Sequence, residues 1–96
     1  MPYVLRERRE AMENGLKLLD HTVETPGDLN YAVCMLMESL AQRTGGNYAA
    51  QNAVLGAVEA AKMEYYRRVV APYEDDKAWE NGDVFGHRYP KEEKAK

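Results

Sequence analysis

A long, alanine-rich run constrains this chain more than any other feature of its sequence. The run begins at Asn47 and is interrupted only at Pro72. Asn47 suits the N-cap position because its side-chain oxygen can accept a hydrogen bond from the first free N–H groups of a helix. Pro72 favours a helix end because proline has no N–H to donate to the preceding turn. The sequence therefore predicts one central helix over residues 48–70.

This central helix has apolar residues on more than one side. One stripe, at a spacing of three or four residues, is formed by Val54, Val58, Ala61, Tyr65 and Val69. The far side carries a row of small residues, Ala50, Ala53, Ala57 and Ala60. A row of alanines lets a second helix approach closely, so both sides are expected to be covered by partners.

A second helix is predicted over residues 26–43. Thr25 is a good N-cap, Pro26 suits the first helical position, and Asp28 can complete a capping box. Gly45 provides the end, because glycine readily adopts the left-handed conformation that closes many helices.

The second helix also has two apolar sides. Its main stripe is typical of a helix that lies on a core and contains Leu29, Val33, Leu36, Met37 and Leu40. Tyr31, Cys34 and Met35 cluster on the opposite side beside Glu38. The single cysteine falls among apolar positions, which predicts a buried thiol in a reducing compartment.

The rest of the chain is read as two further helices and a tail. Apolar residues recur at helical spacing over residues 5–24. Asn14-Gly15 leaves open an alternative in which a short turn over residues 6–12 precedes a separate helix. Residues 73–81 favour a last helix, and Pro72 before it is either a stop or a kink. Residues 86–96 form a charged tail that we expect to be flexible. The sequence thus predicts a small all-α helical bundle in a single domain over residues 1–85.

Composition and charge argue against several classes of partner. The chain has 96 residues, a net charge of −3 and a pI near 5.4, so no global positive field attracts DNA, RNA or an anionic membrane. No apolar stretch is long enough for a signal peptide or a membrane span, which predicts a cytoplasmic protein.

The surplus of apolar faces predicts a homo-oligomer. A two-fold interface is expected on one of two surfaces, either Ala53, Ala57 and Ala60 of the central helix or Tyr31, Cys34 and Met35 of the second helix. The alternative is that the N-terminal and C-terminal segments wrap around the central helix within one chain.

Tyrosine and arginine concentrate at the end of the central helix, where Tyr66, Arg67, Arg68 and Tyr73 are the candidate ligand-binding residues. Arginine forks bind phosphates and tyrosine rings stack on bases, which favours a nucleotide-like anion. The same residue types also anchor protein interfaces, and arginines at a helix end can pair with the acidic run at residues 74–76.

Catalytic and metal chemistry have weaker support. His21 and His87 each lack a second ligand at helical spacing, and Cys34 has no evident base, so no metal, cofactor or catalytic residue is predicted. Paired carboxylates would suit a magnesium-dependent all-α nucleotide pyrophosphohydrolase. The acidic pairs Glu10/Glu13, Glu59/Glu64 and Glu80/Asp83 do not have the required spacing.

Several runs of the chain resemble a family of small uncharacterised proteins, a domain of unknown function, from bacteriophages and bacterial genomes. They are Met-Pro-Tyr-Val at 1–4, Pro-Gly-Asp-Leu-Asn-Tyr at 26–31, Tyr-Arg-Arg-Val-Val-Ala-Pro-Tyr-Glu-Asp at 66–75 and Glu-Asn-Gly-Asp-Val at 80–84. Asn14-Gly15 departs from the Asp-Pro typical of the family, and the tail beyond Phe85 is longer. The resemblance implies a phage or prophage setting, hence a host cytoplasm, and provides no assigned active site.

These observations lead to three functional hypotheses. The first is a non-catalytic oligomeric binding protein that sequesters a nucleotide-derived anion, by analogy of size and architecture with the sponges of phage anti-defence systems. The second is a protein-interaction module that modulates a host or phage protein through the apolar sides of its helices. The third, ranked last, is the pyrophosphohydrolase.

Overall fold

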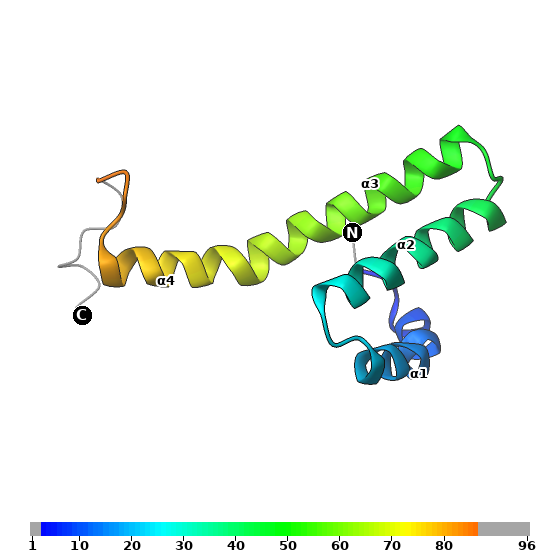
Figure 1. Ribbon diagram of the computed structural model, residues 1–96, viewed down its shortest axis with the longest axis horizontal. Coiled ribbons are helices and arrows are strands. Elements are labelled where there is room, and N and C mark those ends of the chain that lie inside the picture. The colour runs from blue at the N-terminus through cyan, green and yellow to red at the C-terminus, as the bar shows by residue number, and fades with distance from the viewer. Residues whose placement is uncertain (1–2, 87–96) are drawn as a thin grey trace. The chain divides into compact units, whose positions relative to one another are not determined.

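A computed structural model describes residues 3–86, which are helical without any strand and confirm the predicted all-α class (Figure 1). Residues 87–96, and with them most of the predicted tail and His87, lie outside the described residues. In chain order the elements are α1 (Arg6–Thr22), α2 (Pro26–Arg43), α3 (Tyr48–Tyr65), the π-helical turn η1 (Tyr66–Val70) and α4 (Ala71–Asn81).

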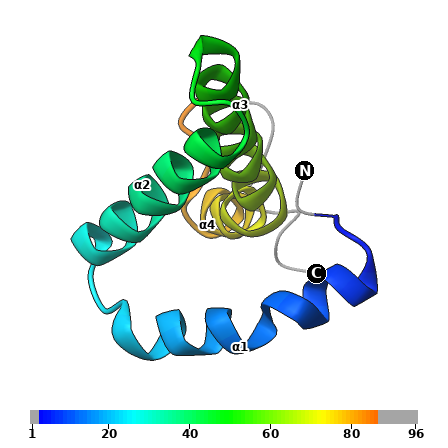
Figure 2. The ribbon, with the colours of Figure 1, turned by 90° about the vertical axis from the view of Figure 1, so that its right-hand side faces the viewer.

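Helix α1 passes through Asn14-Gly15 without a break, so the alternative of a short turn and a separate helix is wrong (Figure 2). A glycine inside a helix costs about 1 kcal/mol relative to alanine. That cost is small beside the hydrogen bonds gained along 17 residues, and it does not end the helix.

Helix α2 begins with the predicted capping box. The backbone N–H of Asp28 donates to the Thr25 hydroxyl over 3.0 Å, and the Asp28 carboxylate accepts from the N–H of Thr25 over 3.2 Å. Pro26 occupies the first helical turn, where its missing N–H has no intrahelical partner to lose. These bonds set where α2 starts.

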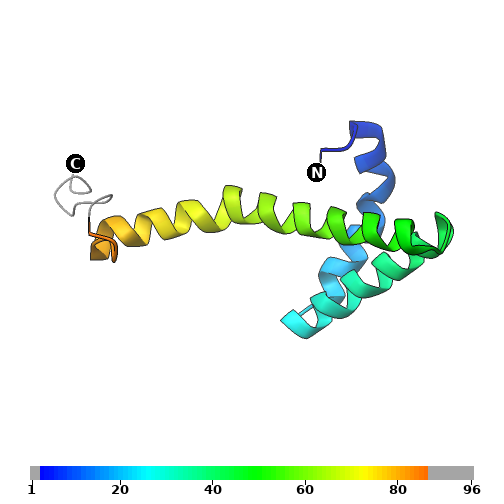
Figure 3. The ribbon, with the colours of Figure 1, turned by 90° about the horizontal axis from the view of Figure 1, so that it is seen from above.

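The turn between α2 and α3 contains Gly45, which was predicted to end α2, followed by Gly46. Gly45 and Gly46 have φ values of 132° and 64°, a region that other residues rarely adopt. The N–H of Gly46 donates to the carbonyl of Ala41 over 2.8 Å, which closes α2. Asn47 then caps α3 by accepting from the N–H of Ala50 over 2.9 Å, and the first half of α3 lies beside α2 (Figure 3).

The buried core of the described residues consists of Ala41 on α2 with Ala50 and Val54 on α3, and Met37 packs against it. The grouping of Ala50 with the far side of the helix is therefore wrong. Ala50 and Val54 are four residues apart, so they lie on the same side and contact α2 together. Small side chains at this contact allow the two helices to approach closely.

Helical structure continues from α3 into α4 through η1, so Pro72 does not stop it. The N–H of Ala71 donates to the carbonyl of Tyr66, five residues back instead of four. This wider turn directly precedes the proline, whose ring would clash with the carbonyl four residues before it in a regular helix. Helix α4 ends at Gly82, which has a φ of 88°.

Contacts between residues divide the chain into two units, Met1–Ala60 and Ala61–Lys96. The first unit contains α1, α2 and most of α3, and the second contains the end of α3, η1 and α4. The single domain expected over residues 1–85 stays a prediction. Within the described residues, no helix combines the length and the apolar character that crossing a membrane requires.

Candidate functional site

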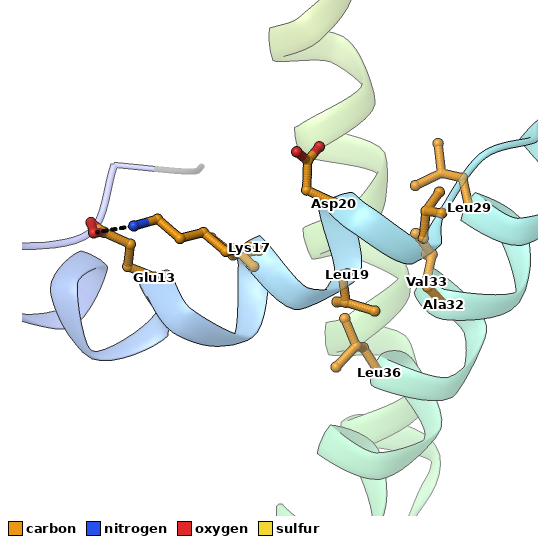
Figure 4. A pocket seen from close by; sticks show the side chains of 10 residues that line it. Glu13, Lys17, Leu19, Asp20, Leu29, Ala32, Val33 and Leu36 are labelled. Atoms are coloured by element: carbon orange, nitrogen blue, oxygen red, sulfur yellow. Dashed lines mark ion pairs between the residues drawn. The ribbon is translucent and has the colours of Figure 1, made fainter.

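An apolar groove of about 550 Å³ lies between α1 and α2 (Figure 4). Leu19 of α1 and Leu36 of α2 point toward each other, and Val33 lies one turn before Leu36 on α2. Polar side chains lie along α1, where Glu13 pairs with Lys17 at 3.5 Å. The apolar lining of this groove is contributed by Leu16, Leu19, Val23, Leu29, Ala32, Val33 and Leu36.

A second groove runs between α2 and the middle of α3, and among the described residues 3–86 no charged side chain lines it. Val33 and Leu36 line both this groove and the one beside α1, so the apolar surface is continuous from α1 across α2 to α3. Its lining consists of Val33, Leu36, Met37, Leu40, Val54, Ala57 and Val58. Leu36 and Leu40 remain 58% and 42% exposed in one chain.

The residues predicted for an oligomer interface are distributed over different surfaces. Tyr31 and Met35 are exposed and line a third groove with Leu19 of α1. Ala57 belongs to the groove between α2 and α3, Ala53 is exposed, and Ala60 is half-buried. Whether another chain covers them stays a prediction.

The expectation of a buried Cys34 thiol is wrong. Cys34 is exposed, and its Sγ donates to Oδ1 of Asn30 over 3.8 Å. It lies on the outer edge of the α2–α3 contact, in a shallow groove with Gln51 and Leu55 of α3. Cys34 has apolar neighbours in the sequence, but the buried core of the described residues is too small to include its side chain.

In the second unit, Glu64 holds the two predicted arginines. One Nη of Arg67 lies 2.8 Å from a carboxylate oxygen of Glu64, and one Nη of Arg68 lies 3.8 Å from the same oxygen. The Glu64 side chain is only 17% exposed, whereas both guanidinium groups are largely exposed. The two positive charges are therefore close together and are partly neutralised by one carboxylate.

The two predicted tyrosines have different partners. The Tyr66 hydroxyl donates to Glu74 over 2.5 Å, across η1, and Lys77 lies 5.6 Å from the centre of the Tyr73 ring. The hydrogen bond to Glu74, together with the negative charge of that carboxylate, raises the pKa of Tyr66 above its ordinary value of 10.0. Arg67 and Arg68 meet at Glu64, and Tyr66 is held by Glu74 instead.

We expected the main apolar stripe of α2 to lie on a core. Met37 does pack against the core, but Leu29, Val33, Leu36 and Leu40 line open grooves. The spacing of Leu16, Leu19 and Val23 on α1, and of Leu29, Leu36 and Leu40 on α2, indicated these apolar surfaces. Periodicity identifies the apolar side of a helix but not what covers it. The role of Glu64 as the partner of both arginines also went unpredicted.

Among residues 3–86, no three side chains of histidine, cysteine, aspartate or glutamate come together as a group suited to a metal ion. The described part of the chain is thus an all-helical protein whose most developed surface features are apolar grooves. The family model for a domain of unknown function, DUF6899, matches residues 1–84, and the chain belongs to this family. No curated protein and no solved structure matches the chain significantly.

Proposed function

We propose that this protein is a non-catalytic helical binding protein that works in a complex with another protein chain, in a cytoplasmic, phage-type setting. The surface used is the continuous apolar one that extends from α1 across α2 to α3. Its function is to present this surface to a partner chain, which makes it an interaction module.

The charge-free lining of the groove between α2 and α3 is the observation that carries this proposal. A unit of about 60 residues normally buries about 60% of the surface that its unfolded chain exposes. In the described part of Met1–Ala60, only Ala41, Ala50 and Val54 are buried. Large exposed apolar surfaces on a small unit are typical of sites that bind another protein.

Sedimentation equilibrium on the purified protein tests the proposal in its simplest form. A complex, either of copies of this chain or with a co-purified protein, is the expected result in the micromolar range. The proposal would be contradicted by a protein that stays monomeric and whose own chain shields the apolar residues of α2 from solvent. Hydrogen exchange and covalent labelling measure that shielding. That outcome would mean that segments of one chain cover the grooves.

A second candidate function is supported by the arrangement of Arg67 and Arg68. Because both guanidinium groups reach the same oxygen of Glu64, they are close enough to hold one phosphate group of a nucleotide-like anion. Tyr66 and Tyr73 are exposed nearby in the chain and would provide rings for stacking. Such an anion has to displace Glu64, which limits its affinity.

A thermal shift assay with a panel of nucleotides and cyclic nucleotides tests this second function. A ligand that binds only the folded protein raises the melting temperature as its concentration exceeds its dissociation constant. The shift should disappear in Arg67→Ala and persist in Arg43→Ala, which removes an exposed arginine of α2 that bonds Ser39. No shift with any member of the panel would reject the nucleotide hypothesis.

A further inference from the structure

The open side of the α2–α3 pair forms a surface that we call the hairpin face, defined by Val33, Leu36, Leu40, Ala57 and Val58. Leu29 extends it toward α1. On α2 the residues at positions 29, 33, 36 and 40 are separated by four, three and four. This is the spacing by which helices interlock side chains in coiled coils and four-helix bundles.

We propose that the hairpin face is a self-association site, which a second copy of this chain covers about a two-fold axis. This inference rests on the proposed function and specifies both the surface and the partner. The two α2–α3 pairs together then form a four-helix bundle. Leu36 and Leu40 of each copy lie at its centre, where they exclude water from both chains.

The absence of charge on this face favours a second copy over a different protein. In a two-fold interface the residues close to the axis meet their own counterparts, so a charged group at the centre of the face would meet a like charge. The residues that line the groove between α2 and α3 are all apolar, so two copies that pack through this face bring no like charges together. A neutral face of this kind carries no charge pattern with which to select a different partner.

The size of the face reaches the lower limit for a specific dimer interface. Helix α2 has 18 residues and is about 27 Å long, and two adjacent helices are roughly 20 Å wide. The face therefore covers on the order of 500 Å² in each copy and about 1,000 Å² in the pair, the lower limit for a specific interface.

Substituting the centre of the face provides the test. Leu36→Glu places a charge opposite its own counterpart and should convert the dimer into a monomer in sedimentation experiments. Two matched variants serve as controls. Leu18→Glu changes a leucine of α1 that is 71% exposed, and Leu55→Glu changes a leucine on the opposite side of the α2–α3 pair. Both should leave the dimer intact.

Leu36→Ala guards against a variant that fails to fold, because alanine keeps the helix and removes only apolar surface. The loss occurs twice in each dimer, so the dissociation constant should rise on the order of 100-fold or more. Circular dichroism of each variant reports whether its helices are retained.

The outcomes separate this inference from the proposed function. If the wild-type protein is assembled and both Leu36 variants remain assembled with the same dissociation constant, the hairpin face is not the interface. If Leu55→Glu alone dissociates the protein, the opposite side of the α2–α3 pair is the interface and the inference is overturned. If the wild-type protein forms a complex only with a different protein, the proposed function stands and self-association is rejected.

Discussion

At the start of α2, the Asp28 carboxylate accepts hydrogen bonds from the backbone N–H groups of Glu24, over 3.0 Å, and Thr25, over 3.2 Å. The bond from Glu24 is the main reason that the pKa of Asp28 lies below its ordinary value of 3.8, and the bonds with Thr25 act in the same direction. Burial opposes this shift. The ionised carboxylate is thus the form that the folded chain prefers.

The first prediction concerns the pH dependence that Asp28 gives to stability. Because its pKa is lowered on folding, its contribution is fully present above 3.8 and is lost as the pH falls through the lower folded value. Asp28→Asn should therefore unfold more easily than wild type near neutral pH, and the difference should shrink below pH 3.8. Chemical denaturation followed by circular dichroism at several pH values, at one protein concentration, measures this difference.

Thr25 provides a matched comparison at the same cap. Thr25→Ala removes the acceptor for the N–H of Asp28 and should cost about 1 kcal/mol of unfolding free energy, whereas Thr25→Ser keeps the hydroxyl and should cost much less. Equal losses in the alanine and serine variants would show that the hydroxyl does not stabilise α2.

At the scale of the element, the five-residue turn η1 sets which residues of the second unit meet. Tyr66 and Glu74 are eight residues apart, and in a regular α-helix two turns take about seven residues. The extra residue that η1 accommodates brings the Tyr66 hydroxyl and the Glu74 carboxylate onto one side. Pro72 stands just after this turn and has no N–H to donate.

The second prediction is that Pro72→Ala changes the register of α4. Alanine restores the N–H and removes the ring clash, so η1 should revert to a regular helical turn and the Tyr66–Glu74 hydrogen bond should be lost. The pKa of Tyr66 should then fall toward 10.0, which an NMR titration of carbon-labelled tyrosine measures. Glu74→Gln is the control, because it lowers the same pKa without changing the helix.

A retained, raised pKa of Tyr66 in Pro72→Ala would mean that the proline does not cause η1. In that case the turn would be set by other side-chain contacts in the second unit. Circular dichroism should show helix content in the alanine variant at least equal to that of wild type, since alanine is the better helix former.

Local signals account for the parts of the fold that the sequence predicted. The cap at Thr25 and the glycine turn before Asn47 depend on bonds within a few residues, so their residue types identify them directly. The turn η1 has no such signature. A proline inside an apolar pattern is compatible with a stop, a kink or a wider turn, and only the surrounding hydrogen bonds decide among them.

At the scale of the whole molecule, the sequence predicted the residues of the candidate site but not what covers or contacts them. Periodicity identified Leu29, Leu36 and Leu40 as one apolar stripe, but the sequence does not say whether its cover comes from the same chain. The Arg67 and Arg68 pair was visible as well. Its pairing with Glu64 could have been predicted too, because Glu64 is the one acidic residue three or four positions from either arginine, but we considered the acidic run at residues 74–76 instead.

The third prediction follows from the small core. If a partner copy completes the fold, unfolding is coupled to dissociation, and stability must rise with protein concentration by mass action. Each tenfold increase in concentration should add about 1.4 kcal/mol to the unfolding free energy of a dimer. Thermal and chemical melts over a hundredfold range of concentration measure this dependence, with Leu36→Glu as a variant expected to show none. A melting temperature that is independent of wild-type concentration would instead require that one chain covers the apolar stripe of α2, as in the alternative where its terminal segments wrap the central helix. The dependence of stability on protein concentration therefore distinguishes coverage of the exposed apolar side chains by a second copy from coverage by segments of the same chain.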